Sequence, residues 1–337
     1  MRIWKFILAI VATITAGTPA VAWDPQGHQL VGAIADQMLN ANARQQVALI
    51  LGYSLQVAAP WPDCVRSIVK EDNGKFDYLP SPFHPEYRTP CLLFEGKVEL
   101  ERMKNYAERN WVNCTYIPGT PGQCHAAFHF ADVPIQRGRY DRSFAGTSDH
   151  DVVSAINAAI AKLQDQPVPA PFSIKDKKEA LFMLAHFVGD IHQPLHVGAV
   201  YLDGDGTLKD PPDPPTTPDP KTETRGGNLI QDGDTNLHSD WDKITETWGP
   251  AADTAMLADA ANVPSTPDPI DGWAAIWASD TVVQAGNAFT GLKFTGPSGH
   301  WAVKFPDSYD ITAQTIKRKQ LAKAGARLAA VLNKIWP

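Results

Sequence analysis

The chain has 337 residues, of which 44% are apolar and 20% are charged, a composition typical of a globular protein with a sizeable core. Its formal net charge is −7, which argues against a basic groove that follows the phosphates of a nucleic acid. If phosphate is the target, another source of positive charge is required, and bound metal ions would supply it.

The first 22 residues have the features of a secretory signal. A positively charged start precedes apolar residues 6–16, which are too few to span a bilayer, and Ala20-Val21-Ala22 forms an A-x-A cleavage site. Cleavage between Ala22 and Trp23 would leave residues 23–337 as the mature chain, secreted or periplasmic. An uncleaved anchor is the alternative, and no other membrane segment is predicted.

The four cysteines are an even number in a chain predicted to be exported, so disulfides are expected. Cys114 and Cys124 bracket a Pro/Gly loop and are predicted to pair, which leaves Cys64 with Cys91. Three connectivities are possible, and this one is preferred only because it closes short loops. Zinc binding by cysteine is less favoured, because no Cys-x-x-Cys occurs.

Helical periodicity begins directly after the proposed cleavage site. Apolar residues at 30, 31, 34, 35 and 38 predict a helix over residues 29–39. His28 would lie near its start, close to the new α-amine, and a neutral amine and its own carbonyl can chelate a cation together. An ordinary polar residue in the first turn is the alternative for His28.

A second short helix is predicted at residues 42–51, and Pro62 is expected to open a third. Within that third helix, Asp63 is either an N-terminal cap or a metal ligand, and Arg66 would share its face. Residues 76–90 contain four prolines and are predicted to be a loop.

Residues 95–110 predict a charged surface helix, and residues 125–134 a short extended segment. In that segment His129 and Asp132 flank Phe130, for which core packing is the commoner alternative to a role in stacking. A further helix is predicted at residues 148–163.

The next predicted helix starts near Lys175 and places His186 and Asp190 on one face, because residues i and i+4 are neighbours. Pro194 is expected to end this helix and to deliver His196 just beyond it. Two imidazoles and a carboxylate are a donor set that suits zinc. A helix that carries polar residues by chance is the alternative.

Residues 202–227 are rich in proline and glycine and predict a long exposed loop without regular structure. Residues 226–238 predict a small hairpin, followed by a helix at residues 243–248. His238 and Asp242 repeat the spacing of the first His-x-x-x-Asp pair. With two more helices at residues 273–288 and 309–335, the sequence predicts one mostly helical domain, all-α apart from the hairpin.

Nine residues that suit metal ions stand out along the chain: Trp23, His28, Asp63, His129, His186, Asp190, His196, His238 and Asp242. They lie in short motifs that occur in this order: Trp61-Pro62-Asp63, His129-Phe130-Ala131-Asp132, His186-Phe187-Val188-Gly189-Asp190 with Gln193-Pro194-Leu195-His196, Gly226-Gly227-Asn228, and Asn236-Leu237-His238 with Trp241-Asp242. This pattern closely resembles the zinc-dependent single-strand nuclease family of fungi and plants, which is related to the bacterial zinc phospholipases C. The resemblance covers nearly all of the mature chain.

The resemblance implies a cluster of three zinc ions in a cleft of a mostly helical fold. One ion would be held by Asp63, His129, His186 and Asp190, and a second by His196, His238 and Asp242. The third would be held by the amine and carbonyl of Trp23 together with His28 and Asp190, so that Asp190 bridges two ions. The other five histidines (His84, His125, His150, His192 and His300) are expected to be surface or core residues.

By the same resemblance, the protein is expected to hydrolyse single-stranded RNA and DNA to products with 5′-phosphates, and to act on 3′-nucleotides. Asp63 would orient the attacking water, Arg66 would stabilise the transition state, and Asn228 would contact the phosphate. Phe130 would stack on a base whose edge Asp132 binds. A monomer without an obligate protein partner is expected.

Two departures from the family pattern, Cys64-Val65 and the Pro-rich loop before Gly226, lie near the proposed substrate side. Two other readings stay open. A phospholipase C would use the same metals on a lipid phosphodiester, and a non-catalytic zinc-binding protein would need closed coordination.

Overall fold

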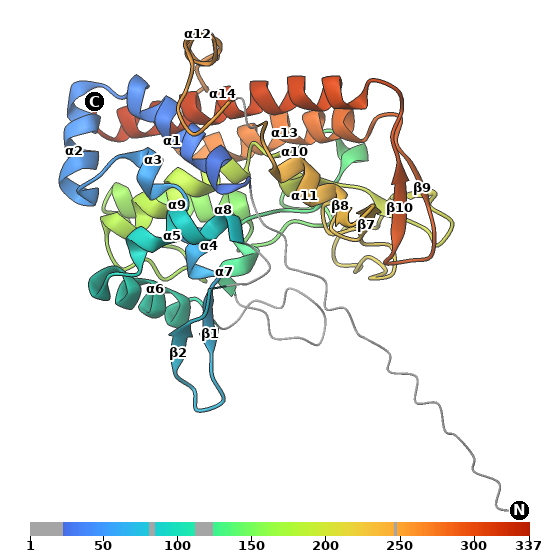
Figure 1. Cartoon of the computed structure of the whole chain (residues 1–337), viewed down its shortest axis with the longest axis horizontal. Helices are drawn as coiled ribbons and strands as arrows, with labels where there is room; N and C mark the ends of the chain where they lie inside the picture. Colours follow the sequence, from blue (N-terminus) through green and yellow to red (C-terminus); the bar gives the residue numbers. More distant parts are fainter. Residues whose placement is uncertain (1–22, 81–84, 112–123, 246–247) are drawn as a thin grey trace, which may run out of the picture.

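The structure is a computed structural model that describes residues 23–80, 85–111, 124–245 and 248–337. The predicted signal and the Cys114–Cys124 pairing lie outside these residues. Helices dominate, and long helices α1 (Pro25–Met38), α9 (Lys177–Asp190), α13 (Trp273–Phe289) and α14 (Tyr309–Ile335) form most of the frame (Figure 1). Within the described residues, no helix combines the length and the apolar character needed to cross a membrane. The predominance of helices confirms the expectation of a mostly helical domain.

Side-chain caps explain where the helices that carry the site begin. The carboxylate of Asp24 accepts a hydrogen bond from the Gly27 amide at the start of α1, where Pro25 occupies the first turn. Asp176 caps α9 in the same way, and Asp151 caps α8 (Val152–Leu163). Each cap satisfies an amide that would lack an intrahelical partner.

The remaining helices have between four and 13 residues. They are α2 (Ala41–Leu51), α3 (Leu55–Ala58), α4 (Trp61–Val65), α5 (Arg88–Cys91), α6 (Lys97–Arg109), α7 (Cys124–Ala127), α10 (Pro194–Val197), α11 (Leu237–Asp242) and α12 (Thr254–Ala261), with 3-10 turns at η1 (Pro85–Tyr87), η2 (Leu92–Phe94), η3 (Ile135–Arg137) and η4 (Ile270–Gly272). The predicted disulfide between Cys64 and Cys91 is confirmed, and it joins α4 to α5. A cross-link that closes a loop of this length stabilises the fold by about 3–4 kcal/mol.

Two glycines allow α1 to be packed tightly on two sides. A Cβ atom on Gly32 would lie 2.5 Å from the Gln56 backbone nitrogen, and one on Gly325 would lie 2.4 Å from the Ile34 side chain. Contacts this short exclude a larger residue, so α3 and α14 approach α1 closely. The large core packs around these helices and α9, and includes Trp61 stacked on Phe182 with 4.6 Å between ring centroids.

The strands are short, and some of them, such as the one at Gly198–Ala199, are buried against the helices. They are β1 (Ile68–Lys70), β2 (Phe76–Tyr78), β3 (Val133–Pro134), β4 (Gly198–Ala199), β5 (Tyr201–Leu202), β6 (Leu208–Lys209), β7 (Ile230–Asp232), β8 (Thr235–Asn236), β9 (Lys293–Thr295) and β10 (Trp301–Lys304). The predicted hairpin is confirmed as β7 and β8. It belongs to a four-stranded sheet in the order β8-β7-β10-β9, in which β10 runs parallel to β7.

Several local predictions were wrong. Helix α9 ends at Asp190, and Pro194 begins the next helix, α10, at a position where its missing amide has no consequence. The helix expected at residues 243–248 is instead α11, which starts earlier because the Asn236 side chain caps it, and Lys243 is extended. The stretch 76–90 holds β2, η1 and α5, residues 125–134 include helix α7, and α12 was not anticipated.

The Pro-rich loop at residues 202–227 is more ordered than predicted. Strands β5 and β6 pair at its start, and Glu223 forms an isolated bridge with Tyr201. The Asp213 carboxylate accepts hydrogen bonds from the Ala145 amide and from Arg137. The Pro-rich loop is therefore anchored to the segment that follows β3.

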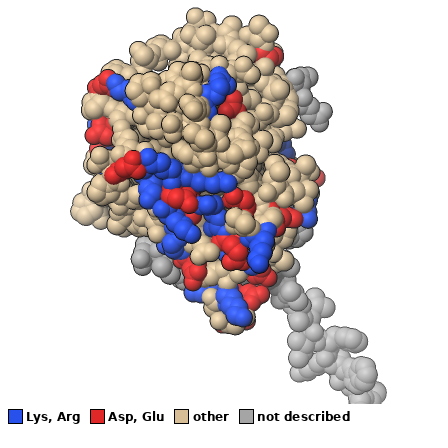
Figure 2. Space-filling view, turned by 90° about the vertical axis from the view of Figure 1, so that its left-hand side faces the viewer, with Lys and Arg blue, Asp and Glu red and all other residues tan. Residues whose placement is uncertain are grey.

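Figure 2 shows one face of the molecule, in which Lys and Arg are interspersed with Asp and Glu over the lower part. Salt bridges such as Lys178–Glu99 and Arg102–Asp176 join α6 to α9 and to the residue that caps it. On the described part of this face, neither sign of charge forms a broad area of its own. This agrees with the acidic composition, which disfavours a basic binding groove.

Candidate metal centre

Six separate stretches of the chain bring their histidines and aspartates together beneath the surface. His28 comes from α1, Asp63 from α4, His129 from the segment after α7, His186 and Asp190 from α9, His196 from α10, and His238 and Asp242 from α11. All eight side chains are buried. Three groups of donor atoms have the spacing of a metal site: His28, Asp63 and His186; His129, His186 and Asp190; and His196, His238 and Asp242.

The group around α9 is the most compact. His129 Nδ1 lies 3.0 Å from Asp190 Oδ2 and 3.0 Å from His186 Nε2, and His186 Nε2 lies 3.2 Å from Asp190 Oδ2. Donors that share one zinc ion at about 2.0–2.1 Å in a tetrahedron are roughly 3.3–3.4 Å apart. The three atoms are therefore close to the edges of such a tetrahedron.

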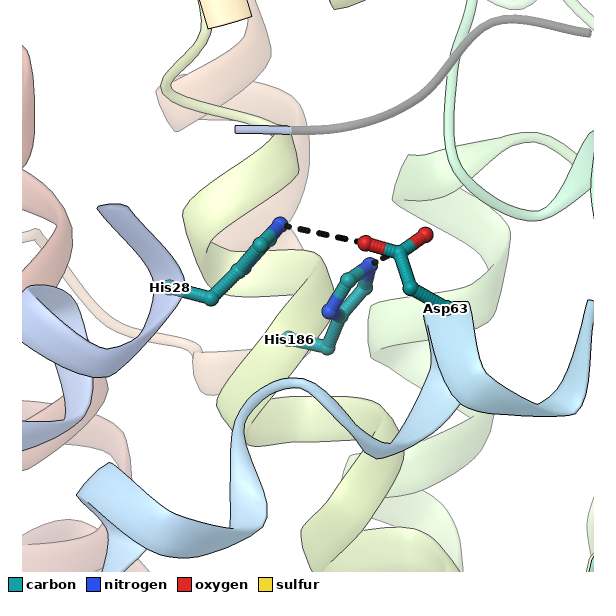
Figure 3. A group of neighbouring side chains, drawn as sticks. All are labelled: His28, Asp63 and His186. Atoms are coloured by element: carbon teal, nitrogen blue, oxygen red, sulfur yellow. Dashed lines mark ion pairs between the residues drawn. The ribbon is translucent and has the colours of Figure 1, made fainter. Parts of the chain in front are cut away.

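His28 lies between Asp63 and Asp190. Figure 3 shows its ring beside that of His186, with both side chains directed toward the Asp63 carboxylate. The two rings stack with 3.7 Å between centroids, and His28 Nε2 is 4.0 Å from Asp63 Oδ2 and 3.4 Å from Asp190 Oδ1. His28 thus approaches Asp190, as the resemblance implied, and also groups with Asp63 and His186.

The third group links α10 to α11. His196 Nε2 is 3.1 Å from His238 Nε2, and the Asp242 carboxylate lies 3.7 Å from the first ring and 3.6 Å from the second. Asp190 Oδ1 is 3.8 Å from His196 Nδ1. Asp190 therefore lies near all three groups, which is the arrangement that a bridging carboxylate requires.

Backbone carbonyls orient three of the imidazoles. His186, His196 and His238 each place Nδ1 at 2.8 Å from a carbonyl oxygen, those of Ala59, His129 and Gly226 respectively. A carbonyl only accepts, so Nδ1 carries the proton, and Nε2 is left to face the other donors. Outer hydrogen bonds of this kind fix the tautomer of a metal-binding histidine.

Two of the histidines and one aspartate have the charge states that a cation requires of its ligands. Burial lowers the pKa of His28 to about 3 and that of His129 to about 4. Against the effect of burial, the imidazoles of His186 and His129 hold the pKa of Asp190 well below its usual value. These groups therefore offer neutral nitrogens and an ionised carboxylate at neutral pH.

Two histidines behave differently because carboxylates outweigh burial. Asp190 and Asp63 raise the pKa of His186, and Asp242 and Asp190 raise that of His196 to about 9. In the metal-free protein the His196 ring therefore holds a proton at neutral pH, and a bound cation must displace it. The His186 ring holds a proton more tightly than an ordinary histidine does.

Several buried polar atoms in the cluster lack a hydrogen-bond partner within the described part of the chain: both ring nitrogens of His28, Asp63 Oδ2, Asp190 Oδ1 and Asp242 Oδ2. Each unsatisfied buried group costs about 1–3 kcal/mol. A cation would satisfy nitrogen lone pairs and carboxylate oxygens at once, whereas a proton can serve only one pair of atoms. The residues present therefore fit a metal cluster.

The N-terminal end of the described chain lies against the same cluster. The Trp23 indole donates to the Gly189 carbonyl at 3.0 Å, and the Tyr87 hydroxyl donates to the Trp23 carbonyl at 3.4 Å. A Cβ atom on Gly189 would lie 2.8 Å from His28 Nδ1. Glycine at this position lets α9 pass directly beside His28 and Trp23.

The residues predicted to act on the substrate lie around the cluster. Arg66 Nη1 is 3.4 Å from Asp63 Oδ1, with 12% of the arginine side chain exposed. Phe130 and Asp132 are half-buried, and burial together with Glu223 raises the pKa of Asp132 to about 7. The side-chain amide of Asn228 donates to the Arg225 carbonyl at 2.8 Å.

A turn with left-handed backbone angles lies between Asp132 and the third group. Arg225, Gly226 and Gly227 have φ angles of 53°, 57° and 93°. A Cβ on Gly226 would lie 2.3 Å from the Leu195 carbonyl, 3.2 Å from His238 Nδ1 and 3.4 Å from Asp132 Oδ1. The two glycines of the motif are thus explained by their positive φ angles and, at Gly226, by a backbone that lies too close to the Leu195 carbonyl for any larger residue.

Sequence reasoning missed two side chains that support the cluster. Gln193 is buried, and its amide donates to Asp242 Oδ1 at 2.6 Å. Its place inside Gln193-Pro194-Leu195-His196 was a usable signal. Lys317 is also buried and contacts the end of α11, but nothing in the local sequence of α14 distinguishes it from the exposed lysines beside it.

A mostly helical frame around three buried His/Asp groups defines a protein built to hold a cluster of metal ions. The comparisons with known proteins specify which kind. The model of the S1/P1 Nuclease family matches residues 23–337, and the chain belongs to this family. The predicted family resemblance is therefore confirmed, and the protein is a nuclease, a hydrolase of phosphodiester bonds.

Similar proteins with names of this kind occur in plants and fungi. Endonuclease 1 of Arabidopsis thaliana is 26% identical, over 98% of this chain and 93% of its own length. Endonuclease 5 of the same plant is 28% identical, over 100% of this chain and 97% of its own length. Nuclease PA3 of a Penicillium species is 28% identical, over 64% of this chain and 78% of its own length.

Proposed function

We propose that the protein is a secreted, zinc-dependent endonuclease that hydrolyses single-stranded RNA and DNA to products with 5′-phosphates, and that it also acts as a 3′-nucleotidase. The observation that carries the proposal is the juxtaposition of three buried His/Asp groups with Arg66 beside Asp63. It acts as a monomer and needs no protein partner.

Zinc is the cation that this donor set favours, because neutral imidazoles and carboxylates in small coordination groups are its usual protein ligands. The proposed ligand sets are Asp63, His129, His186 and Asp190 for one ion, His196, His238 and Asp242 for another, and the Trp23 amine and carbonyl, His28 and Asp190 for the last. When bound, zinc acidifies water to a pKa near 7 and neutralises phosphate oxygens.

Asp63 and Arg66 are the proposed catalytic residues. Against the effect of burial, His186, His129 and Arg66 lower the pKa of Asp63, so its carboxylate accepts a hydrogen bond from the attacking water and orients it. The Arg66 guanidinium, 3.4 Å from that carboxylate, donates to the phosphate oxygens as negative charge develops on them.

Three residues are proposed to bind substrate. Phe130 stacks on a base, which contributes about 1–3 kcal/mol and requires an unpaired base face. Asp132 hydrogen-bonds the edge of that base, and Asn228 contacts the phosphate. A preference for single strands follows, because a base inside a duplex has both faces covered.

The proposal is tested with residues 23–337 purified with zinc and assayed on single-stranded RNA and DNA, duplex DNA, a 3′-nucleotide and phosphatidylcholine. Single strands and the 3′-nucleotide should be cleaved, duplex DNA at least about tenfold more slowly. Asp63→Asn should abolish cleavage. Arg44→Ala on α2, which removes a hydrogen bond to the Leu39 carbonyl at the end of α1, should leave cleavage unchanged. Hydrolysis of phosphatidylcholine alone would contradict the proposal.

A further inference from the structure

Helix α11 carries two members of the third group but is only six residues long. A helix this short is not stable by itself, and the carbonyls of its last turn have no partners within the helix. The position of Asp242, its final residue, therefore depends on contacts from outside α11.

Lys317 of α14 supplies two of these contacts. Its ammonium donates to the Asp240 carbonyl at 2.6 Å and to the Lys243 carbonyl at 2.8 Å, and lies 5.5 Å from the centre of the Trp241 ring. Only 4% of Lys317 is exposed. An ammonium buried to this degree is costly unless it is well paired, and both of its hydrogen bonds go to the segment that ends α11.

Asp24, which lies near the start of the described chain, also holds the segment that ends α11. Its amide donates to the Asp242 carbonyl at 2.9 Å, and its Oδ2 accepts from the Ile244 amide at 3.2 Å. Its other carboxylate oxygen caps α1, the helix that carries His28. The end of α11 is thus fixed between the residue that caps α1 and the first third of α14.

We propose that Lys317 is a positioning residue for the group of His196, His238 and Asp242, and that it sets the cation affinity of this group. It holds the backbone on both sides of Asp242, so that the carboxylate stays within 3.6–3.7 Å of the two imidazoles. The inference rests on the proposed function only in that a cation binds this group. Loss of an outer contact to a metal site typically weakens metal binding 10- to 100-fold.

Lys317→Met removes the charge and both donors while it keeps the length of the side chain. Zinc binding is measured on residues 23–337 by competition with a chromophoric chelator, without substrate. One zinc site should weaken by about 10- to 100-fold, and the other sites should keep wild-type affinity. Activity of the variant should recover when free zinc is raised, with KM unchanged.

Lys323→Met is the matched control. Lys323 lies on the same helix, but its ammonium pairs with Asp280 at 2.7 Å. This variant should bind zinc as the wild type does. Unchanged zinc affinity in Lys317→Met, or an equal loss in both variants, would overturn the proposal.

Lys317→Gln is the second variant, for use if Lys317→Met does not fold. It retains an amide donor, so an intermediate loss of zinc affinity at one site is expected. Wild-type affinity in this variant would also overturn the proposal. Because the readout is zinc binding, a protein that binds zinc but cleaves no nucleic acid would refute the proposed function and leave this inference intact.

Discussion

Three buried histidines lie close together in the sequence but have different surroundings: His186 in α9, His196 in α10, and His192 between these helices. His192 has both ring nitrogens partnered, Nδ1 with the Val188 carbonyl and Nε2 with the Arg327 guanidinium, and Arg327 in turn pairs with Asp280. His186 and His196 each have one nitrogen on a carbonyl, while the other faces a second imidazole at 3.0–3.1 Å.

The difference separates a structural network from a site. Around His192, hydrogen-bond donors face acceptors, so both nitrogens of this ring are satisfied by the protein alone. Around Asp190, acceptor atoms of several side chains converge, and some lack any hydrogen-bond partner within the described residues. Convergence of lone pairs is the arrangement that a cation-binding site requires.

Removal of metal is the change with the largest expected effect. Dialysis against EDTA should reduce cleavage of single-stranded RNA by on the order of a thousandfold or more, since the water then loses its acidification. Added zinc should restore the rate. Full activity in protein shown to be metal-free would refute the metal mechanism.

Asp190→Asn should have the next largest effect, because this carboxylate lies near all three groups. We expect cleavage to fall by on the order of a hundredfold or more and zinc content to drop. Asp280→Asn is the matched control in the network around His192 and should retain both activity and zinc. Equal losses in the two variants would erase the distinction between the two regions.

One residue added ahead of Trp23 should impair the proposed third zinc site, because the α-amine would be moved away from His28. Loss of about one zinc per chain and a rate lower by roughly 10- to 100-fold are expected. Atomic spectroscopy on the extended and the correctly processed chains measures the change. Identical zinc content and rate would count against ligation by the amine.

Phe130→Ala should raise KM for single strands by about tenfold, in line with the loss of one stacked base, with little change in Tm. Phe305→Ala, which removes a half-buried ring that packs on Tyr309, is the control and should leave KM unchanged. An unfolded Phe130→Ala variant would show that this ring serves the core.

The smallest expected effect concerns the contribution of the network around His192 to stability. Against the effect of burial, Lys323 and Arg327 lower the pKa of Asp280. A carboxyl with a lowered folded-state pKa stabilises the protein above its unfolded pKa of about 3.9, and this stabilisation is lost as pH falls through the folded value. In zinc-free protein, urea unfolding should show Asp280→Asn less stable by about 1–2 kcal/mol at pH 7. The difference should shrink in acid, and a difference independent of pH would contradict this assignment.

The sequence predicted the main helices because apolar periodicity is a local signal, as at residues 29–39. The capping roles of Asp24, Asp151 and Asp176 emerged from the structure. The Cys64–Cys91 disulfide was also predicted, and all the described side chains predicted as ligands, from His28 to Asp242, lie together.

The errors fall where distant residues decide the structure. Strand β10 pairs with β7 across about 70 residues of sequence, so the hairpin gave no sign of the larger sheet. Helix α11 is fixed by Asn236 at its start and by Lys317 and Asp24 at its end. No local pattern identifies a lysine as buried, which is why Lys317 emerged only from the structure.

The most direct test of this account is the zinc content of the processed chain, residues 23–337, measured by atomic spectroscopy after extensive dialysis. Three buried His/Asp groups around the Asp190 carboxylate lead us to expect three zinc ions per chain. A protein that is active with one zinc, or with none, would contradict the cluster.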